Sequence, residues 1–232
     1  MRHIVNIVIN KINNQFIFYD KEIGIDIAEW FQKENFKDSK NNTVSLVNNG
    51  LWVKKHYVRK GMASFLGDYY LNTQIQNTRS YREFYLLNRL HKTLPTCKPI
   101  FGWVTRSTFF YTANLITEYI PSVTLESYIR QQKMNEDDWI KIGQLILKLH
   151  QENIFHGDLN ITNILVKNDS KSEKFYLVDF DKSYLLHKID ERAKISNLKR
   201  LARSLQKNNL FSRSNFKNII NGYDNFNLDM IL

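Results

Sequence analysis

The chain has 232 residues, of which 43% are hydrophobic, enough for one large domain or for two small lobes that share a cleft. Its 33 Lys and Arg against 23 Asp and Glu give a formal net charge of +10, which favours an anionic partner: nucleic acid, a phosphorylated small molecule or an acidic membrane surface. The chain is also rich in Asn, so an AT-rich genome is an alternative source of this excess of positive charge.

The single cysteine, Cys97, excludes an internal disulfide and suits a reducing compartment. No apolar run approaches the roughly 20 residues that span a bilayer, and the start lacks the layout of a signal peptide, so we expect a soluble or peripheral protein.

Apolar alternation typical of β-strands dominates the first half of the chain. The predicted strands run over 4–19, over 43–58 with a hairpin turn at 48–50, and around 100–118 with a turn near 105–107. The turn Asn48-Asn49-Gly50 is a strong hairpin signal, because such residues adopt the positive φ angles of tight turns. Two helices are also predicted here, a short one over 25–31 and one over 80–90 where apolar residues recur at helical spacing.

The second half of the chain is richer in helical periodicity. Helices are predicted over 125–132, 137–150 and 197–207, and short strands over 164–167 and 175–178. The helix over 197–207 turns three leucines inward and four cations outward, namely Lys199, Arg200, Arg203 and Lys207. A strand-rich half joined to a helix-rich half near residue 120 indicates an α+β fold with an N-lobe over about 1–119 and a C-lobe over about 120–232.

Acids and amides stand between apolar residues in two stretches, HGDLNITNIL at 156–165 and LVDFDKS at 177–183. Burying such groups without partners is costly, so we expect their oxygens to have binding partners. The stretches resemble the catalytic and metal-binding loops of the protein-kinase-like superfamily, His-x-Asp-Leu-x-x-x-x-Asn followed by a strand that ends in Asp-Phe-Gly. The matching residues are His156, Asp158, Leu159, Asn163 and Asp179-Phe180. A loop whose acids only cap helices or turns is the alternative, and the presence of both elements argues against it.

This resemblance implies phosphoryl transfer from ATP, a reaction that depends on positioning and on neutralising phosphate charge. Asp158 would orient the attacking hydroxyl and accept its proton. Asn163 would offer an amide oxygen to Mg²⁺, and Asp179 a carboxylate, because this ion prefers oxygen ligands. We expect His150 and His156 to be structural hydrogen-bonding residues, since neither has the partner of a catalytic base.

The superfamily also pairs a strand lysine with a helix glutamate. The stretch GLWVKKHY offers Lys54 and Lys55, and strand alternation places Val53 and Lys55 on one face. In kinases the small residue two positions before the lysine covers the adenine, a role that Val53 suits better than a tryptophan, so we favour Lys55 over Lys54. Glu83, the only acid of its predicted helix, is the expected partner.

Several positions depart from the protein-kinase pattern. Gly157 stands where regulated protein kinases carry arginine, and Asp181 replaces the last glycine of the metal loop. Too few residues follow Asp181 for a large helical lobe, which indicates a reduced C-lobe. The phosphate-covering hairpin expected near 40–43 contains no glycine. The interlobe segment, whose backbone meets the adenine edge in kinases, would include Glu118 and Ile120.

Beyond the superfamily, the chain is similar to the bacterial lipopolysaccharide kinase family, especially its kinases of 3-deoxy-D-manno-octulosonic acid (Kdo). The similar stretches are VKKHYVRKGM, TRSYREFYLLNRLHKTLPTCKPI, YTANLITEYIPSVTLESYI, HGDLNITNILV with LVDFDKS, and NLKRLARSLQK. The resemblance implies a single protein-kinase-like two-lobed domain over 1–232, ATP and Mg²⁺ as cofactors, and phosphorylation of a Kdo hydroxyl on a Kdo-lipid A precursor. It also implies a peripheral location at the cytoplasmic face of the bacterial inner membrane.

A basic acceptor site would suit such a substrate, because Kdo carries a carboxylate and lipid A carries phosphates. The candidate residues flank the expected cleft and are Arg59, Lys60, Arg79 and Arg82. Cations on the last predicted helix would also favour reversible docking on an anionic membrane surface, at about 1 kcal/mol per residue.

Two other functions remain as alternatives. A small-molecule phosphotransferase of the aminoglycoside or choline kinase type shares HGDL and the metal loop, but its cationic substrates require acidic rather than basic surroundings. A non-catalytic pseudokinase is disfavoured because Lys55, Glu83, Asp158, Asn163 and Asp179 are all present. Nucleic acid is not an expected partner, since only net charge supports it and the chain has no groove-reading motif.

Overall fold

The structure is a computed structural model that describes residues 6–23, 26, 27, 29, 31, 43–59, 67–131, 134–167 and 174–223. The chain divides into two compact units. Unit 1 comprises Met1–Arg89 with Lys98–Tyr119, and unit 2 comprises Leu90–Cys97 with Ile120–Leu232. Unit 1 is therefore interrupted by a short segment that belongs to unit 2, and the chain passes finally into unit 2 after Tyr119.

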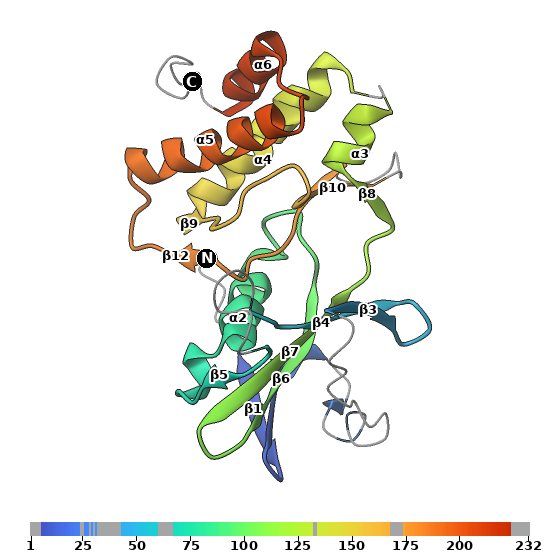
Figure 1. The fold of residues 1–232 in the computed structure, drawn as a ribbon, viewed down its shortest axis with the longest axis vertical. Helices are drawn as coiled ribbons and strands as arrows, with labels where there is room; N and C mark the ends of the chain where they lie inside the picture. Colours follow the sequence, from blue (N-terminus) through green and yellow to red (C-terminus); the bar gives the residue numbers. More distant parts are fainter. Residues whose placement is uncertain are drawn as a thin grey trace. The chain divides into compact units, whose positions relative to one another are not determined.

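Unit 1 is built on an antiparallel sheet (Figure 1). Across the sheet, its described strands are β1 (Ile7–Ile12), β2 (Gln15–Asp20), β6 (Pro99–Arg106), β7 (Phe110–Glu118), β4 (Trp52–His56) and β3 (Val44–Val47), with β5 (Tyr70–Leu71) paired to β7. The short 3-10 helices η1 (Lys21–Ile23) and η3 (Ile75–Asn77) lie between strands in the chain. The central strands β6 and β7 are buried along most of their length, which explains their nearly continuous apolar sequences.

Asparagine and glycine shape two of the hairpins of unit 1. Asn13 turns β1 into β2 with a φ of 53°, and Asn48, Asn49 and Gly50 turn β3 into β4 with φ angles of 50°, 54° and 82°. These left-handed conformations are those that Asn and Gly adopt more readily than other residues. The second hairpin turns where the sequence predicted it.

The core of unit 1 packs side chains against the sheet. Helix α2 (Arg79–Leu90) places Phe84 edge-on to Phe18 of β2, with ring centroids 5.5 Å apart. A further apolar cluster consists of Ile17, Ile27, Phe31, Ile100, Phe101, Trp103 and Ile116. Full burial of each such side chain contributes roughly 1.5–3 kcal/mol. This packing fixes β4 and α2, the elements that carry the predicted lysine and glutamate.

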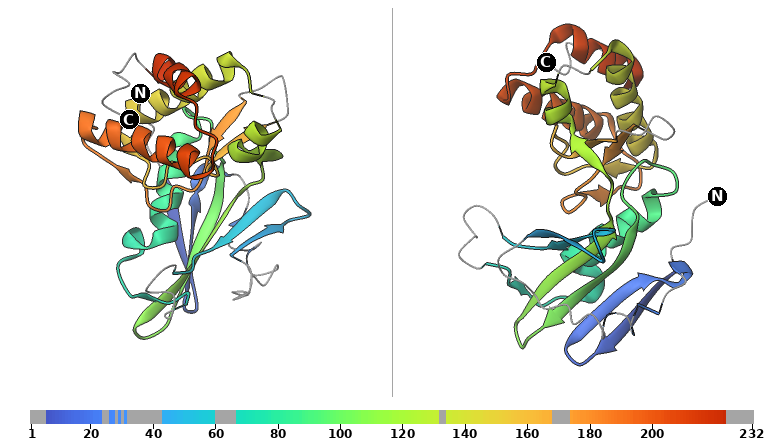
Figure 2. Two further views of the ribbon diagram at one scale, coloured as in Figure 1. Left: turned by 45° about the horizontal axis from the view of Figure 1, so that its top comes forward. Right: turned by 90° about the vertical axis from the view of Figure 1, so that its right-hand side faces the viewer.

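Unit 2 is mainly helical. Its described helices are α3 (Leu125–Arg130), α4 (Glu136–Gln151), α5 (Glu191–Lys207) and α6 (Arg213–Tyr223). Strand β10 (Ile164–Lys167) lies between β11 (Phe175–Leu177) and β8 (Ser122–Thr124), and β9 (Ile154–Phe155) pairs with β12 (Tyr184–Leu185). Figure 2 shows the α4, α5 and α6 helices grouped at one end of this unit, with the short strands at the other.

Glycines allow α4 and α6 to approach closely. A Cβ atom on Gly143 would lie 2.0 Å from the Ile219 carbonyl oxygen, and one on Gly222 would lie 2.0 Å from that of Ile140. Each helix therefore needs a glycine at the crossing, because a larger side chain would collide with backbone. The close contact anchors α6 to the helix that ends just before the predicted catalytic loop.

Several boundaries differ from those predicted. Helix α5 begins at Glu191 rather than Asn197, because Asp190 caps it by accepting the Ala193 N–H at 2.8 Å. Helix α6 was not predicted, and neither were the short strands β5, β8, β9 and β12, whereas β11 falls within the strand predicted over 175–178. Of the helix predicted over 25–31, the structure describes four residues, and three of them, Ile27, Glu29 and Phe31, are helical. The hairpin expected at 40–43 lies outside the described residues apart from its last residue.

Candidate active site

The predicted catalytic loop connects β9 to β10 within unit 2. The Asp158 side chain is 40% exposed, and its two carboxylate oxygens lie 3.2 Å from Asn160 Nδ2 and 3.5 Å from Lys182 Nζ. Asn160 also donates to the Asp158 carbonyl oxygen at 3.1 Å, which fixes the backbone beneath the carboxylate. An accessible carboxylate on a tightly bonded loop can reach a substrate hydroxyl as a general base does.

The side-chain amide of Asn163 has a defined orientation. Its Nδ2 donates to the Asp158 carbonyl oxygen at 2.9 Å. Because a carbonyl can only accept, the amide nitrogen must face it, and Oδ1 is directed elsewhere. No donor among the described residues meets that oxygen. The arrangement leaves a hard oxygen ligand available for a divalent cation.

The predicted metal loop is bonded directly to the catalytic loop. The Val178 N–H donates to the Asn163 carbonyl at 3.0 Å, and His156 Nε2 donates to the Val178 carbonyl at 3.2 Å. Asp179 itself has a φ of 63°, a left-handed conformation that is uncommon for residues other than glycine and that recurs at functional sites. Unit 2 thus brings together Asp158, Asn163 and the backbone of Asp179.

Gly157 is required by the approach of the metal loop. A Cβ atom at this position would lie 2.0 Å from the Lys182 carbonyl oxygen. The arginine that regulated protein kinases carry here could not be accommodated without moving the backbone. Glycine rather than arginine is therefore needed at position 157, because the backbone after Asp181 passes so close to it.

A network of buried hydrogen bonds links helices of unit 2 to the backbone of the predicted catalytic loop. Asn197 of α5 accepts the His156 N–H at 3.1 Å and donates to the His156 carbonyl at 2.8 Å. His150 of α4 donates from Nε2 to the same Asn197 oxygen at 3.0 Å and accepts from the Tyr223 hydroxyl through Nδ1 at 2.7 Å. Three helices therefore hold one backbone segment of the loop, and both histidines have structural hydrogen-bonding roles, as expected.

This network predicts a dependence of stability on pH. Burial lowers the pKa of His150 from 6.5 to about 4. Between pH 6.5 and 4 the unfolded chain binds a proton that the folded chain does not, so the contribution is complete above pH 6.5 and is lost as the pH falls towards 4. We expect the free energy of unfolding to decrease by about 3 kcal/mol over that range because of His150. Denaturant titrations at several pH values would measure it, and His150→Gln, which cannot titrate, should lack this component; an unchanged pH profile in that variant would contradict the assignment.

Unit 1 contains the predicted lysine–glutamate pair. Lys55 Nζ lies 3.1 and 2.8 Å from the two carboxylate oxygens of Glu83, whose side chain is only 3% exposed. The Tyr57 hydroxyl also donates to the Glu83 carboxylate. Lys54 points elsewhere, with its Nζ 5.3 Å from the centroid of the Trp103 ring and its side chain buried. Of the two candidate lysines, Lys55 is thus the one that the structure pairs with Glu83.

The adjacent lysines form a matched pair for mutagenesis. If Lys55 contacts nucleotide phosphates, Lys55→Met should lower kcat/KM for ATP by about 10²–10³, the cost of removing one electrostatic donor from a transition state. Lys54→Met removes a lysine of the same strand and should reduce stability by about 1–2 kcal/mol through its contact with Trp103, while kcat/KM stays near the parent value. Steady-state kinetics of both variants would test this, and a reversed order would reject the assignment of Lys55.

Near the end of β7, some backbone N–H groups form hydrogen bonds within the protein, and one could still donate to a ligand. The Glu118 N–H donates to the Lys98 carbonyl at 2.8 Å, and the Tyr119 N–H to the Leu51 carbonyl at 2.9 Å. The Ile120 carbonyl accepts from the Ser122 hydroxyl at 2.8 Å, whereas the Ile120 N–H has no partner among the described residues. Val53 lies on β4 opposite Thr117 and is partly exposed. A contact of these groups with adenine remains a prediction.

The predicted acceptor-binding arginines gather around tyrosines of unit 1. Arg59 lies 4.6 Å above the Tyr70 ring, and Arg79 donates to the Tyr70 hydroxyl at 2.5 Å. Burial raises the pKa of Tyr70, so its phenol stays neutral between the two guanidinium groups. Arg82 is exposed, one helical turn beyond Arg79. The fourth candidate, Lys60, lies outside the described residues.

Two other properties bear on possible ligands. The described residues contain no group of three or more His, Cys, Asp or Glu side chains that could hold a metal ion. A metal at Asn163 and Asp179 would therefore complete its coordination with phosphate oxygens and water, as Mg²⁺ commonly does. Among the helices that the structure describes, none is long and apolar enough to cross a bilayer.

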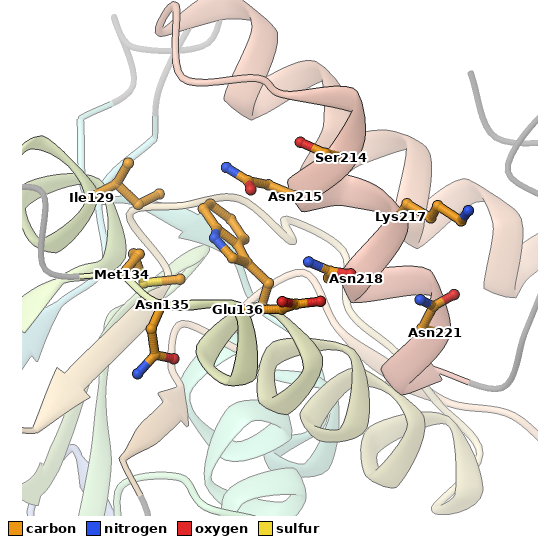
Figure 3. A pocket seen from close by; sticks show the side chains of 10 residues that line it. Ile129, Met134, Asn135, Glu136, Ser214, Asn215, Lys217, Asn218 and Asn221 are labelled. Atoms are coloured by element: carbon orange, nitrogen blue, oxygen red, sulfur yellow. The ribbon is translucent and has the colours of Figure 1, made fainter.

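A surface hollow of about 750 Å³ lies in unit 2, away from the predicted site residues (Figure 3). Its lining includes Asn215, Asn218 and Asn221 of α6, and Met134 and Asn135 just before α4. Trp139, which is almost fully buried, also lines it. None of the residues assigned from the sequence contributes to this hollow.

Comparisons with known proteins agree with the geometry. The sequence profile described as "Lipopolysaccharide kinase (Kdo/WaaP) family" matches residues 28–223. The chain belongs to this family. A 3-deoxy-D-manno-octulosonic acid kinase of Pasteurella multocida is 41% identical over 178 residues, covering 73% of each chain, and one of Haemophilus influenzae (strain Rd) is 32% identical over 91% of this chain and 96% of its own. The family predicted from the sequence is confirmed.

The fold prediction is also confirmed. A solved structure described as WaaP in complex with acyl carrier protein superimposes with a TM-score of 0.58 at 16% identity, covering 88% of this chain and 89% of that one. At this identity the similarity concerns the fold alone. It is the α+β, protein-kinase-like arrangement expected from the motifs.

Four residues of the site were not predicted from the sequence. Tyr57 binds Glu83, Asn160 and Lys182 contact the Asp158 carboxylate, and Asn197 holds the backbone of His156. Asn160 lies within the catalytic loop, so its position beside Asp158 was a usable signal. Lys182 lies within the second loop, 177–183, whereas Tyr57 and Asn197 meet their partners only in the folded chain.

Proposed function

We propose that this chain transfers the terminal phosphoryl group of ATP to a hydroxyl of Kdo on a Kdo-lipid A precursor, in the biosynthesis of the lipopolysaccharide core. The observation that carries the proposal is the bonded pair of loops with Asp158, Asn163 and Asp179, in a chain 41% identical to a protein named 3-deoxy-D-manno-octulosonic acid kinase. The named relative supplies the substrate, and the loops supply the chemistry.

The chemistry follows from the residues of unit 2. Asp158 accepts the proton of the attacking substrate hydroxyl. The hydroxyl oxygen forms a bond to the terminal phosphorus of ATP, the bond from that phosphorus to the bridging oxygen breaks, and ADP leaves. The Oδ1 of Asn163 and the carboxylate of Asp179 would hold Mg²⁺, which neutralises phosphate charge when bound. The bond between Val178 and Asn163 keeps the two ligands on adjoining loops.

Residues of unit 1, and Ile120 at the point where the chain enters unit 2, would supply the groups for the nucleotide, and unit 1 would supply those for anionic parts of the acceptor. Lys55, held by Glu83, contacts phosphates, Val53 covers the adenine, and backbone groups of Glu118 and Ile120 meet its edge. Tyr57 links this pair to the arginines, because its hydroxyl binds Glu83 and Arg79 lies 5.6 Å from its ring.

The acceptor carries a carboxylate and phosphates, and guanidinium groups bind both in a bidentate manner. We assign these anions to the basic set predicted from the sequence, namely Arg59, Lys60, Arg79 and Arg82. We propose that the enzyme meets this lipid acceptor at the cytoplasmic face of the inner membrane, as a peripheral protein.

Mass spectrometry of acceptors tests the proposal. Purified protein with ATP and Mg²⁺ should add one phosphoryl group to a Kdo-lipid A precursor and none to a lipid A precursor without Kdo. Kanamycin, choline and casein serve as acceptors for the rival phosphotransferase types. Phosphorylation of one of these, with none on the Kdo-bearing lipid, would reject the proposed function.

A further inference from the structure

The positive charge of the chain is concentrated in one segment. Residues 182–217 contain ten Lys or Arg and only two acids, Asp190 and Glu191, so this segment has a net charge of +8 out of the total of +10. A general bias in composition would distribute the excess along the chain. The concentration instead points to a particular surface of unit 2.

Helix α5 presents the largest part of this charge. Five exposed cations lie on it, namely Arg192, Lys199, Arg200, Arg203 and Lys207. At 100° per residue they occupy an arc of roughly 100°, and at 1.5 Å per residue they extend over about 22 Å. We name this surface the α5 stripe. Figures 1 and 2 show α5 as an outer helix of unit 2.

The described residues do not neutralise the α5 stripe. No ion pair joins any of its five cations to an acid in the part of the chain that the structure describes. Lys199, Arg203 and Lys207 follow one another at a spacing of four residues, which destabilises a helix when the charges are alike. Elsewhere in unit 2 exposed cations are paired at this spacing, Lys141 with Asp137 and Arg130 with Glu126. The repulsion within the stripe would be relieved by an external anionic surface.

The same helix holds the catalytic loop. Its inner flank binds the His156 backbone through Asn197, and Ser204 Oγ accepts the Ile161 N–H at 3.2 Å. A surface in contact with the α5 stripe would thus lie within about one helix diameter, roughly 10–12 Å, of the loop. A sugar that projects by this distance from the headgroups would reach the loop.

We propose that the α5 stripe docks unit 2 on anionic lipid headgroups and so brings the catalytic loop to the sugar of a membrane-embedded acceptor. The choice of a lipid surface rests on the proposed function for the nature of the acceptor. It is supported by the lack of aromatic residues on α5, because proteins that bind single-stranded nucleic acid commonly stack aromatic side chains on bases.

Vesicle sedimentation tests the docking surface. The full chain is mixed with phosphatidylcholine vesicles that contain 30% phosphatidylglycerol, and with vesicles of phosphatidylcholine alone. We expect binding only to the anionic vesicles, weakened by salt. The triple variant Arg192→Gln, Lys199→Gln, Arg203→Gln should bind about 100-fold more weakly, because each cation near such a surface contributes about fivefold.

A matched control removes the same charge elsewhere. Lys11→Gln, Lys21→Gln and Lys148→Gln replace three exposed cations outside α5 and should leave vesicle binding near that of the parent. Equal binding by the stripe variant and the control would overturn the proposal. So would tight binding to a DNA duplex that depends on the stripe, with no binding to anionic vesicles.

Kinetics separate this proposal from the proposed function. On a water-soluble, deacylated Kdo acceptor the stripe variant should be as active as the parent, and on the same acceptor headgroup embedded in anionic vesicles it should be slower. Stripe-dependent vesicle binding by a protein that phosphorylates no Kdo acceptor would support the docking surface and reject the proposed function. If the stripe variant phosphorylated the embedded acceptor at an unchanged rate, the proposed function would be supported and the docking surface rejected.

Discussion

Asp158→Asn is expected to lower kcat for phosphoryl transfer by about 10²–10⁴, the usual contribution of a positioned general base. The substitution removes the proton acceptor and leaves the shape of the side chain nearly unchanged. The oxygen that accepts from Asn160 at 3.2 Å is retained, and the Asn160 and Asn163 bonds to the Asp158 carbonyl do not involve the side chain. The loop should therefore keep its conformation, and loss of activity would report chemistry.

One binding measurement and one control variant separate the effect on chemistry from effects on binding and folding. Calorimetric titration with a non-hydrolysable ATP analogue and Mg²⁺ should give nearly the parent dissociation constant, because Asp158 is not assigned to the nucleotide or the metal. Asp190→Asn is the matched control, with the same change of charge within unit 2. Asn caps a helix as well as Asp does, so the bond to the Ala193 N–H is preserved and activity should be retained. An Asp158→Asn enzyme with more than about a tenth of the parent kcat would exclude a general-base role, given its expected size.

Much of the site could be predicted because its residues stand at fixed spacings within short segments. Asp158 and Asn163 lie in one loop before β10, and Asp179 follows β11, the strand that pairs antiparallel with β10, so a short hairpin brings them near each other. The choice of Lys55 over Lys54 depended on the alternation of a strand, and the bond of Lys55 to Glu83 agrees with it. In both cases a regular backbone converts sequence spacing into spatial position.

Other features depended on contacts between distant segments. The first two turns of α5 were missed because Ala193, Lys194 and Ile195 are only half-buried there, so the apolar pattern begins late. Helix α6 does have a helical pattern, with Phe216, Ile219, Ile220 and Tyr223 buried, but its several asparagines favour turns when only the local sequence is considered. Asn197 lies among residues of a basic amphipathic helix, and only the folded chain shows that its side chain faces a loop more than forty residues earlier.

Asn197→Ala is expected to destabilise unit 2 and to disorder the catalytic loop. The substitution leaves three buried groups without their partner, namely the N–H and the carbonyl of His156 and the Nε2–H of His150. An unsatisfied buried polar group costs about 1–3 kcal/mol, so a loss of about 3–5 kcal/mol is expected, a large part of the stability of a typical domain. Denaturant unfolding would measure it, and kcat should fall together with stability because the loop carries Asp158.

Asn197→Asp keeps the test valid should the alanine variant fail to fold. The carboxylate preserves both acceptor bonds and removes only the donor to the His156 carbonyl, so we expect a smaller loss than for alanine. It would also place a negative charge 3.0 Å from His150 Nε2 and favour the protonated imidazole, so the pH-dependent component assigned to His150 should diminish. Gln206→Ala changes an exposed residue of the same helix and serves as the control. If the alanine variant were as stable and active as this control, the network through Asn197 would not be what positions the catalytic loop.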